Sequence, residues 1–179
     1  TGVQTCALPI FLSATLRNFK FQTKEFSTET FWTESTTAGF AAEFICKDLE
    51  LKIDPNQAYL AASLCNVGKL VGAICYADQI DQAYVLTNNP KEPINWPEAE
   101  KRLDAYNHGV LGEIAATLWG FPDYVLKPIM SHHTPSSQVK DEIQGNMMFF
   151  DDADEDTNET KGPRIEDLVA LANQYSHWI

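Results

Sequence analysis

The stretch Leu64-Cys65-Asn66-Val67-Gly68-Lys69-Leu70 joins two apolar segments that both predict buried helices. Upstream, Asp54-Pro55 opens a helix, because Asp can cap the first turn and Pro is tolerated at its first position. The small apolar residues at 58–64 continue that helix, and Gly68 is expected to end it. A second apolar helix is expected over 70–76. Two short apolar helices in direct succession indicate a core built from helices.

Helical periodicity also dominates the rest of the chain. Apolar residues recur every three to four positions over 30–49, 108–118, 123–133 and 164–178, and a short polar helix is expected over 98–106. The residues expected to face the core in the first two of these helices are Phe31, Ala38, Ala41, Phe44, Ile45 and Leu49, then Val110, Leu111, Ile114, Ala115 and Leu118. Because no segment alternates as a strand does, the predicted fold class is all-α.

Most aromatic residues are expected in the core, with one exception. Trp96 lies in a proline-rich loop at 88–97, which makes it a candidate for an exposed contact. The apolar run at 147–150 is either a helix packed on the core or part of a partner surface. The aromatic residues assigned to the core are Phe31, Trp32, Trp119 and Phe121.

The composition is that of an ordinary globular chain with a strongly acidic balance. Of 179 residues, 44% are hydrophobic, and the net charge is -12. A surface of this charge repels phosphate backbones, so nucleic-acid binding is not expected. The longest apolar run, 70–77, is short of the ~20 residues that span a bilayer, so no membrane span is expected. The acidic run at 151–160 is interpreted as a solvated loop, with a cation site or a basic partner as the alternative.

The first ten residues are expected to be foreign to the natural protein. TGVQTCALPI at 1–10 is the translation of a common sequencing-adapter sequence, so natural sequence is expected from Phe11 onward, within a longer reading frame. The remainder suits one domain of roughly 100–200 residues. Of the four cysteines, Cys6 lies in the foreign segment, which leaves Cys46, Cys65 and Cys75. Their odd number and apolar surroundings predict buried free thiols in a reducing, cytoplasmic compartment.

Three of the four histidines, His108, His132 and His133, lie in or beside predicted buried helices. With the stretch at 64–70 they resemble the HD superfamily of metal-dependent phosphohydrolases, which carries L-H-D-I-G-K-L where this chain has L-C-N-V-G-K-L. The ordered set of motifs is most similar to HDOD domains, the HD-related output domains of bacterial signalling proteins. Its members are W-T-E-S at 32–35, A-Y-L-A-A-S-L at 58–64, H-x-x-x-G with W-x-x-P at 108–122, I-x-x-H-H at 129–133 and V-A-L-A-N at 169–173.

The resemblance implies an HD-domain-like helical bundle over 28–179, preceded at 11–27 by the end of a truncated helical lobe. It also implies a metal site that has lost most of its ligands. Only three ligand positions are kept in this chain, and the others are replaced: His108, His132 and His133 remain, while Glu34, Cys65, Asn66 and Asn173 stand where the enzymes have His, His, Asp and Asp. The loss of the carboxylate at Asn66 matters most, because that group can bridge two metals in the enzymes and a neutral amide replaces it poorly.

Two interpretations of the surviving residues stay open. The first is that the histidines are structural, which implies no cofactor. The alternative is a remodelled site for one zinc or iron, built from Glu34, Cys65, His108 and one of His132 and His133. Only one of the two adjacent histidines is expected to face the site, because neighbouring helical residues point about 100° apart. Lys69 is interpreted as a favourable charge at a helix C-terminus, although it can contact phosphate in the resembled enzymes.

The resemblance therefore predicts a non-catalytic signal-transduction module that acts through protein partners, fused signalling domains or ligand contacts. Two other functions remain as alternatives. One is a phosphohydrolase or phosphodiesterase of the HD superfamily with an altered ligand set. The other is a metal-free sensor of a small molecule that uses the ancestral cavity.

Overall fold

The computed structural model describes residues 21–133 and 163–176, and the regular structure in these ranges is helical throughout. The helices are α2 (Thr28–Asp48), α3 (Pro55–Leu64), α4 (Val67–Cys75), α5 (Ala77–Thr87), α6 (Trp96–Arg102), α7 (His108–Leu118), α8 (Asp123–Ser131) and α10 (Ile165–Ser176). This confirms the all-α prediction. The expectations for 1–10, 147–150 and 151–160 concern residues outside these ranges.

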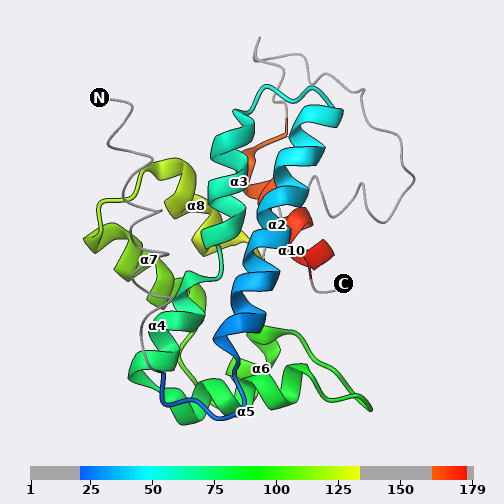
Figure 1. Ribbon diagram of the computed structural model, residues 1–179. Helices are drawn as coiled ribbons and strands as arrows, with labels where there is room; N and C mark the ends of the chain where they lie inside the picture. Colours follow the sequence, from blue (N-terminus) through cyan, green and yellow to red (C-terminus); the bar gives the residue numbers. More distant parts are fainter. Residues whose placement is uncertain (1–20, 134–162, 177–179) are drawn as a thin grey trace, which may run out of the picture.

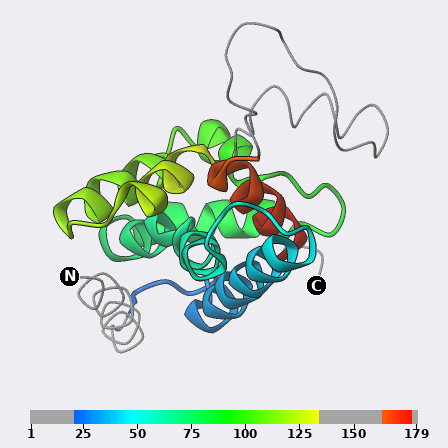
Figure 2. The same cartoon turned by 90° about the horizontal axis from the view of Figure 1, so that it is seen from above.

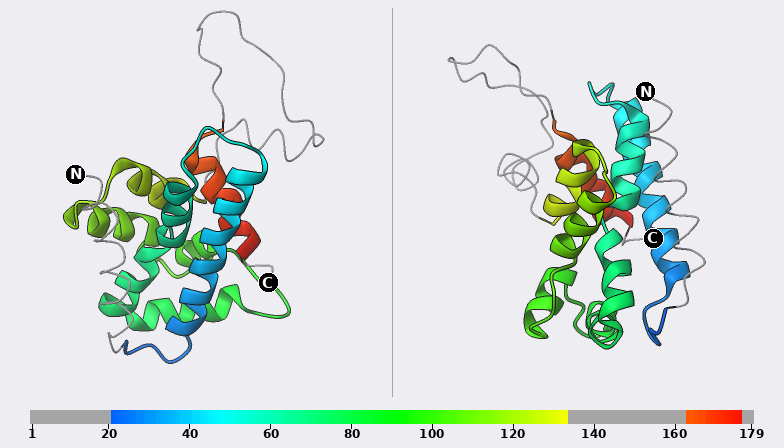
Figure 3. Two further views of the ribbon diagram at one scale, coloured as in Figure 1. Left: turned by 45° about the horizontal axis from the view of Figure 1, so that its top comes forward. Right: turned by 90° about the vertical axis from the view of Figure 1, so that its left-hand side faces the viewer.

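The helices form a bundle in which α2 packs along α3 and against α10 (Figure 1). Helices α7 and α8 lie together on the side of the bundle away from α2 (Figure 2 and Figure 3). Helix α4 packs along α7, while α3 and α10 both contact α8. The start of α7 and the end of α8 are therefore held in place by α4, α3 and α10.

The interface of α2, α3 and α10 is built from small side chains. Its buried members are Ala38, Ala42 and Cys46 of α2, Ala58, Ala61 and Ala62 of α3, and Leu168, Val169 and Ala172 of α10. A Cβ atom on Gly39 of α2 would lie 2.9 Å from the ring of Tyr59 on α3. Because the two helices approach this closely, the bulky residues of α2 cannot lie between them. The prediction that Phe44 and Leu49 face the core is wrong: they are 67% and 49% exposed.

The same size effect determines which face of α7 is buried. The predicted inward residues Val110, Ile114 and Leu118 are 47%, 54% and 80% exposed. The buried face consists of Ala115, as predicted, together with His108, Gly109, Gly112 and Ala116. Small residues on this face let α4 and α8 pack closely against α7.

The break between the two apolar helices lies at Cys65-Asn66, not at Gly68. Helix α3 ends at Leu64 and α4 begins at Val67, so Gly68 is inside the first turn of α4. Asp54 caps α3 as predicted, by accepting a hydrogen bond from the backbone N–H of Asn56 at 2.8 Å. Lys69 consequently lies near the start of a helix and is 2% exposed. Its interpretation as a charge at a helix C-terminus is therefore wrong.

Helices α5 and α6 differ most from the predictions. The sequence reading assigned no helix to α5, and it placed α6 over 98–106. Asn95 caps α6 by accepting a hydrogen bond from the backbone N–H of Glu98 at 2.9 Å, and Trp96 is the first helical residue. Trp96 is 6% exposed and belongs to the core, so the expectation of an exposed contact is wrong. Cys46 and Cys65 are buried as predicted, whereas Cys75 at the end of α4 is exposed.

Within the described residues, one stretch, Pro55–Cys75, is long and apolar enough to cross a membrane by length and composition. It consists of α3, the turn at Cys65-Asn66 and α4. Within this stretch, 67% of the 18-residue segment with high hydropathy is buried inside the fold. A buried core helix of a globular protein meets the same criteria of length and composition.

Candidate functional site

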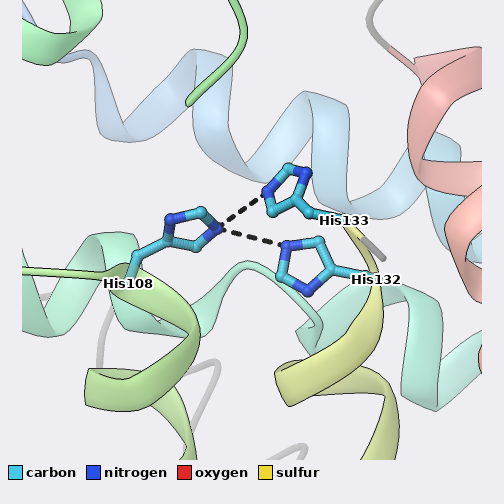
Figure 4. Close-up of side chains that lie close together, drawn as sticks. All are labelled: His108, His132 and His133. Carbon is cyan, nitrogen blue, oxygen red and sulfur yellow. Dashed lines mark hydrogen bonds between the residues drawn. The ribbon is translucent and has the colours of Figure 1, made fainter. Parts of the chain in front are cut away.

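His108, His132 and His133 come together between the start of α7 and the end of α8, with their rings directed toward one another (Figure 4). The Nε2 atom of His108 lies 3.2 Å from Nε2 of His132 and 3.0 Å from Nε2 of His133. One ring nitrogen from each of the three lies within 4.8 Å of the other two. The rings of His108 and His132 are each 1% exposed. Three nitrogen donors thus converge in a largely buried space.

Both adjacent histidines face His108, which corrects the expectation that only one of them would. Helix α8 ends at Ser131, and His132 is its C-cap residue, with φ -61° and ψ -15°. His133 lies in the turn that follows. The rotation of about 100° per residue describes where neighbouring Cβ atoms point in a regular helix. It does not fix where the ring nitrogens lie, and Nε2 of each ring lies within 3.2 Å of Nε2 of His108.

The Nδ1 atoms on the far sides of two of these rings face oxygen acceptors. Nδ1 of His108 lies 2.6 Å from Oε1 of Glu100, which also accepts the backbone N–H of His108 at 3.0 Å. Nδ1 of His132 lies 2.9 Å from the carbonyl oxygen of Ile129 and 3.2 Å from that of Pro128. Carbonyl oxygens only accept hydrogen bonds, so Nδ1 of His132 carries a proton. Glu100 and the last turn of α8 therefore orient the two buried rings.

Glu100 is a site residue that the sequence reading missed. It lies on α6 and is 3% exposed, although the segment at 98–106 was expected to form a short polar helix. Trp96 is buried four positions earlier on the same helix, so the two side chains share one face. The burial of this face comes from tertiary packing, which the sequence did not reveal. Burial raises the pKa of Glu100 to about 7, against the opposing effects of the His108 N–H and the Lys69 charge.

Burial dominates the protonation of the other ionisable groups around the cluster. It lowers the pKa of His132 well below its usual range, and the charges of His108 and Lys69 add to the effect. It lowers the pKa of Lys69 to about 8, although Glu34, Cys65 and Glu100 favour the charged form. The Lys69 ammonium lies 4.4 Å from the centroid of the Trp96 ring, a cation–π contact. A buried cation with nearby carboxylates thus lies beside the histidines.

Three of the four replaced ligand positions, Cys65, Asn66 and Asn173, form a separate group of neutral side chains. The Nδ2 of Asn66 donates to Oδ1 of Asn173 at 2.6 Å and lies 3.5 Å from Sγ of Cys65. The thiol of Cys65 lies 3.1 Å from the carbonyl oxygen of Ala62 in the preceding turn. Burial raises the pKa of Cys65 to about 12, so in the metal-free chain the sulfur is a thiol near neutral pH.

The expected set of Glu34, Cys65, His108 and one further histidine is not assembled as predicted. The metal-ligand cluster found among the described residues consists of His108, His132 and His133. Cys65 directs its thiol toward Ala62 and Asn173 instead. Glu34 interacts electrostatically with Lys69, and burial raises the pKa of this carboxyl group. The donor set that the fold brings together therefore contains imidazoles without a thiolate.

The chemistry and spacing of the three imidazoles fit one divalent cation of the zinc class. Zinc binds histidine nitrogen at about 2.0–2.1 Å in tetrahedral geometry, which separates two such nitrogens by about 3.4 Å. The Nε2 separations of 3.2 Å and 3.0 Å from His108 are close to this value. The cluster does not fit a dinuclear centre, because the carboxylate that bridges two ions in the resembled enzymes is replaced by Asn66.

Comparison with known proteins adds a family match and a similar fold. The sequence model of the HDOD domain family matches residues 2–135. The fold is similar to the crystal structure of an HDOD domain protein of unknown function from Geobacter sulfurreducens, with a TM-score of 0.66 and 22% sequence identity. That similarity covers 96% of this chain and 47% of the other, so the chain spans about half the length of that protein. No curated protein matches the chain.

Proposed function

Since the chain belongs to the HDOD domain family, we propose that it is a regulatory module without phosphohydrolase activity. The module would act within a longer signalling protein, through contacts with protein partners or ligands. The observation that carries this proposal is the pairing of Asn66 with Asn173 at 2.6 Å, where the resembled enzymes have carboxylate ligands.

The physical reason lies in the charge that phosphoryl transfer requires. Metal-dependent hydrolysis needs an ion that activates water and polarises a phosphoryl oxygen, and a pair of ions clamps the attacking and leaving oxygens. Asn66 and Asn173 are neutral and are hydrogen-bonded to each other, and the pKa of the Cys65 thiol is about 12. The two amides supply no anionic ligand, and the Cys65 thiol is protonated near neutral pH in the metal-free chain. The surviving histidines alone would hold a single ion with no bridged partner.

A hydrolysis assay tests this proposal. The purified chain is incubated with a generic aryl phosphodiester and with Mn²⁺ or Fe²⁺ added. We expect turnover no higher than that of the metal solution alone. Turnover that disappears in His108→Ala, and persists in the control Cys75→Ser at an exposed position, would overturn the proposal.

The convergence of His108, His132 and His133 favours a second candidate function, a module that responds to a bound metal ion. The three imidazoles would hold the ion, which would act as a cross-link between α7 and the turn after α8. Such an ion supplies Lewis acidity when it is bound. The protein's own contribution would be to fix the relative position of two helices, so that loading with metal changes the surface offered to a partner.

A further inference from the structure

We propose that Glu100 is a positioning residue that holds the His108 ring with Nε2 facing His132 and His133, the orientation in which the three nitrogens could share one zinc-class cation. This inference rests on the second candidate function, the metal-responsive module. Glu100 occupies no ligand position of the resembled enzymes, and it contacts the cluster through His108.

The first step concerns the orientation of the His108 ring. Oε1 of Glu100 lies 2.6 Å from Nδ1 and also accepts the backbone N–H of His108 at 3.0 Å. The carboxylate thus binds both the ring and the backbone of the same residue. With Nδ1 held by Glu100 on one side of the ring, Nε2 on the other side points into the cluster, toward His132 and His133. A carboxylate on the far nitrogen is the usual partner of a histidine that binds a metal.

His132 is oriented in the same way by the end of α8. Its Nδ1 faces the carbonyl oxygens of Ile129 and Pro128, so its Nε2 is directed toward Nε2 of His108 at 3.2 Å. Nε2 of His133 lies 3.0 Å from the same His108 atom. Three nitrogens placed in this way could coordinate one cation together.

The third step concerns the kind of cation. The cluster offers neutral imidazoles, which suit zinc, copper, iron and nickel, whereas magnesium and calcium prefer carboxylate and carbonyl oxygens. The three ring nitrogens therefore suit a cation of the zinc class.

The contribution of Glu100 can be separated from that of the ligands by substitution. Glu100→Gln keeps an oxygen that accepts both hydrogen bonds but removes the charge that makes the imidazole a stronger donor. We expect the zinc affinity to fall about 10-fold, within the 10–100-fold range that is usual for such partners. Glu98→Gln is the matched control, because Glu98 lies on the same helix in an exposed ion pair with Arg102. This control should bind zinc as the wild type does.

In the experiment, the full chain is first stripped of metal with a chelator. Titration with Zn²⁺ against a competing chromophoric chelator then measures the zinc affinity. Titration with Co²⁺, followed by absorption spectroscopy, reports the coordination of the bound ion. The wild type should bind one equivalent and give the intense visible bands of four-coordinate Co²⁺. His108→Ala should abolish them. Absence of stoichiometric binding in the wild type would overturn both this inference and the metal-responsive function, while the proposal of a module without hydrolase activity would stand.

Two further outcomes isolate the role of Glu100. If the wild type binds zinc but Glu100→Gln binds it as tightly as Glu98→Gln does, the site stands and the positioning role is wrong. If Glu100→Gln fails to fold, nitrogen-15 NMR of the wild-type histidines decides the question. A His108 ring protonated on Nδ1 in the zinc-loaded chain supports the inference, and a ring protonated on Nε2 overturns it.

Discussion

Gly68 in the first turn of α4 lies directly against the backbone carbonyl of His108 at the start of α7. A Cβ atom on Gly68 would overlap that carbonyl oxygen and would lie 2.7 Å from the backbone nitrogen of Gly112. The glycine therefore sets how closely α4 can pack on α7. Because His108 is the first residue of α7, this contact also sets the position of its ring relative to His132.

Gly68→Ala should destabilise the fold even though alanine is the better helix former. The added methyl group meets backbone atoms of α7, which cannot move without shifting the helix. We expect a loss of about 1–3 kcal/mol in the free energy of unfolding, as for other overpacked interfaces. The measurement is urea denaturation followed by circular dichroism.

Gly72→Ala in the same helix is the control for this substitution. Its Cβ would lie 2.7 Å from the end of the flexible Ile80 side chain, which can adopt another rotamer. We expect a change of less than about 1 kcal/mol, because helix propensity offsets the repacking. Equal losses at Gly68 and Gly72 would show that the contact with His108 does not control the packing of α4 on α7.

The hydrogen bond between Asn66 and Asn173 has a direction that substitutions can reveal. Asn66 donates through Nδ2 and Asn173 accepts through Oδ1, at 2.6 Å. Asn66→Asp replaces the donor with an oxygen that repels the acceptor, whereas Asn173→Asp keeps the accepting atom. In chelator-treated protein at neutral pH we therefore expect Asn66→Asp to lose about 1–3 kcal/mol more unfolding free energy than Asn173→Asp. Urea denaturation measures the difference, and the reverse order would mean that both amides are flipped.

The sequence was sufficient to predict the all-helical fold, because helix periodicity and end signals are local. Asp54 before Pro55 caps α3 as predicted. The faces of α2 and α7 could not be predicted from hydrophobicity alone. Close helix packing selects small side chains, so Gly39 and Gly112 are buried while larger apolar residues are exposed. The size of the side chains determines which face of each helix is buried. The spacing of apolar residues alone does not specify this face.

The candidate site was predicted in part, because motifs identify ligand positions but not the contacts around them. His108, His132 and His133 were identified, and the replacements at Cys65 and Asn66 were recognised from the 64–70 stretch. The convergence of all three rings required the chain path beyond α8. The orienting role of Glu100 depends on the burial of α6, which is set by tertiary contacts. A lone acid in a polar segment carries no such signal.

The buried Lys69 predicts a pH dependence that differs between the wild type and Lys69→Met. Burial lowers the pKa of Lys69 from its ordinary value of 10.5 to about 8 in the folded chain. Between these two values the unfolded chain binds more protons, so raising the pH favours the folded state. Stability contributed by this group is therefore gained from about pH 8 to pH 10.5, and the charged form costs stability below that window. Methionine has a similar length and does not titrate.

Urea denaturation of both proteins at pH 7.5, 9 and 10.5, with chelator present, measures this difference. The wild type should gain up to about 3 kcal/mol relative to Lys69→Met across the window, since each pKa unit corresponds to about 1.4 kcal/mol. Cys65 lowers the free energy of unfolding as the pH rises above 9, because its pKa of about 12 in the folded chain exceeds its ordinary value of 9.0. That effect is common to both proteins and largely cancels in the comparison. A difference that stays constant with pH would mean that Lys69 keeps its ordinary pKa, and that its ammonium reaches water rather than resting on the Trp96 ring.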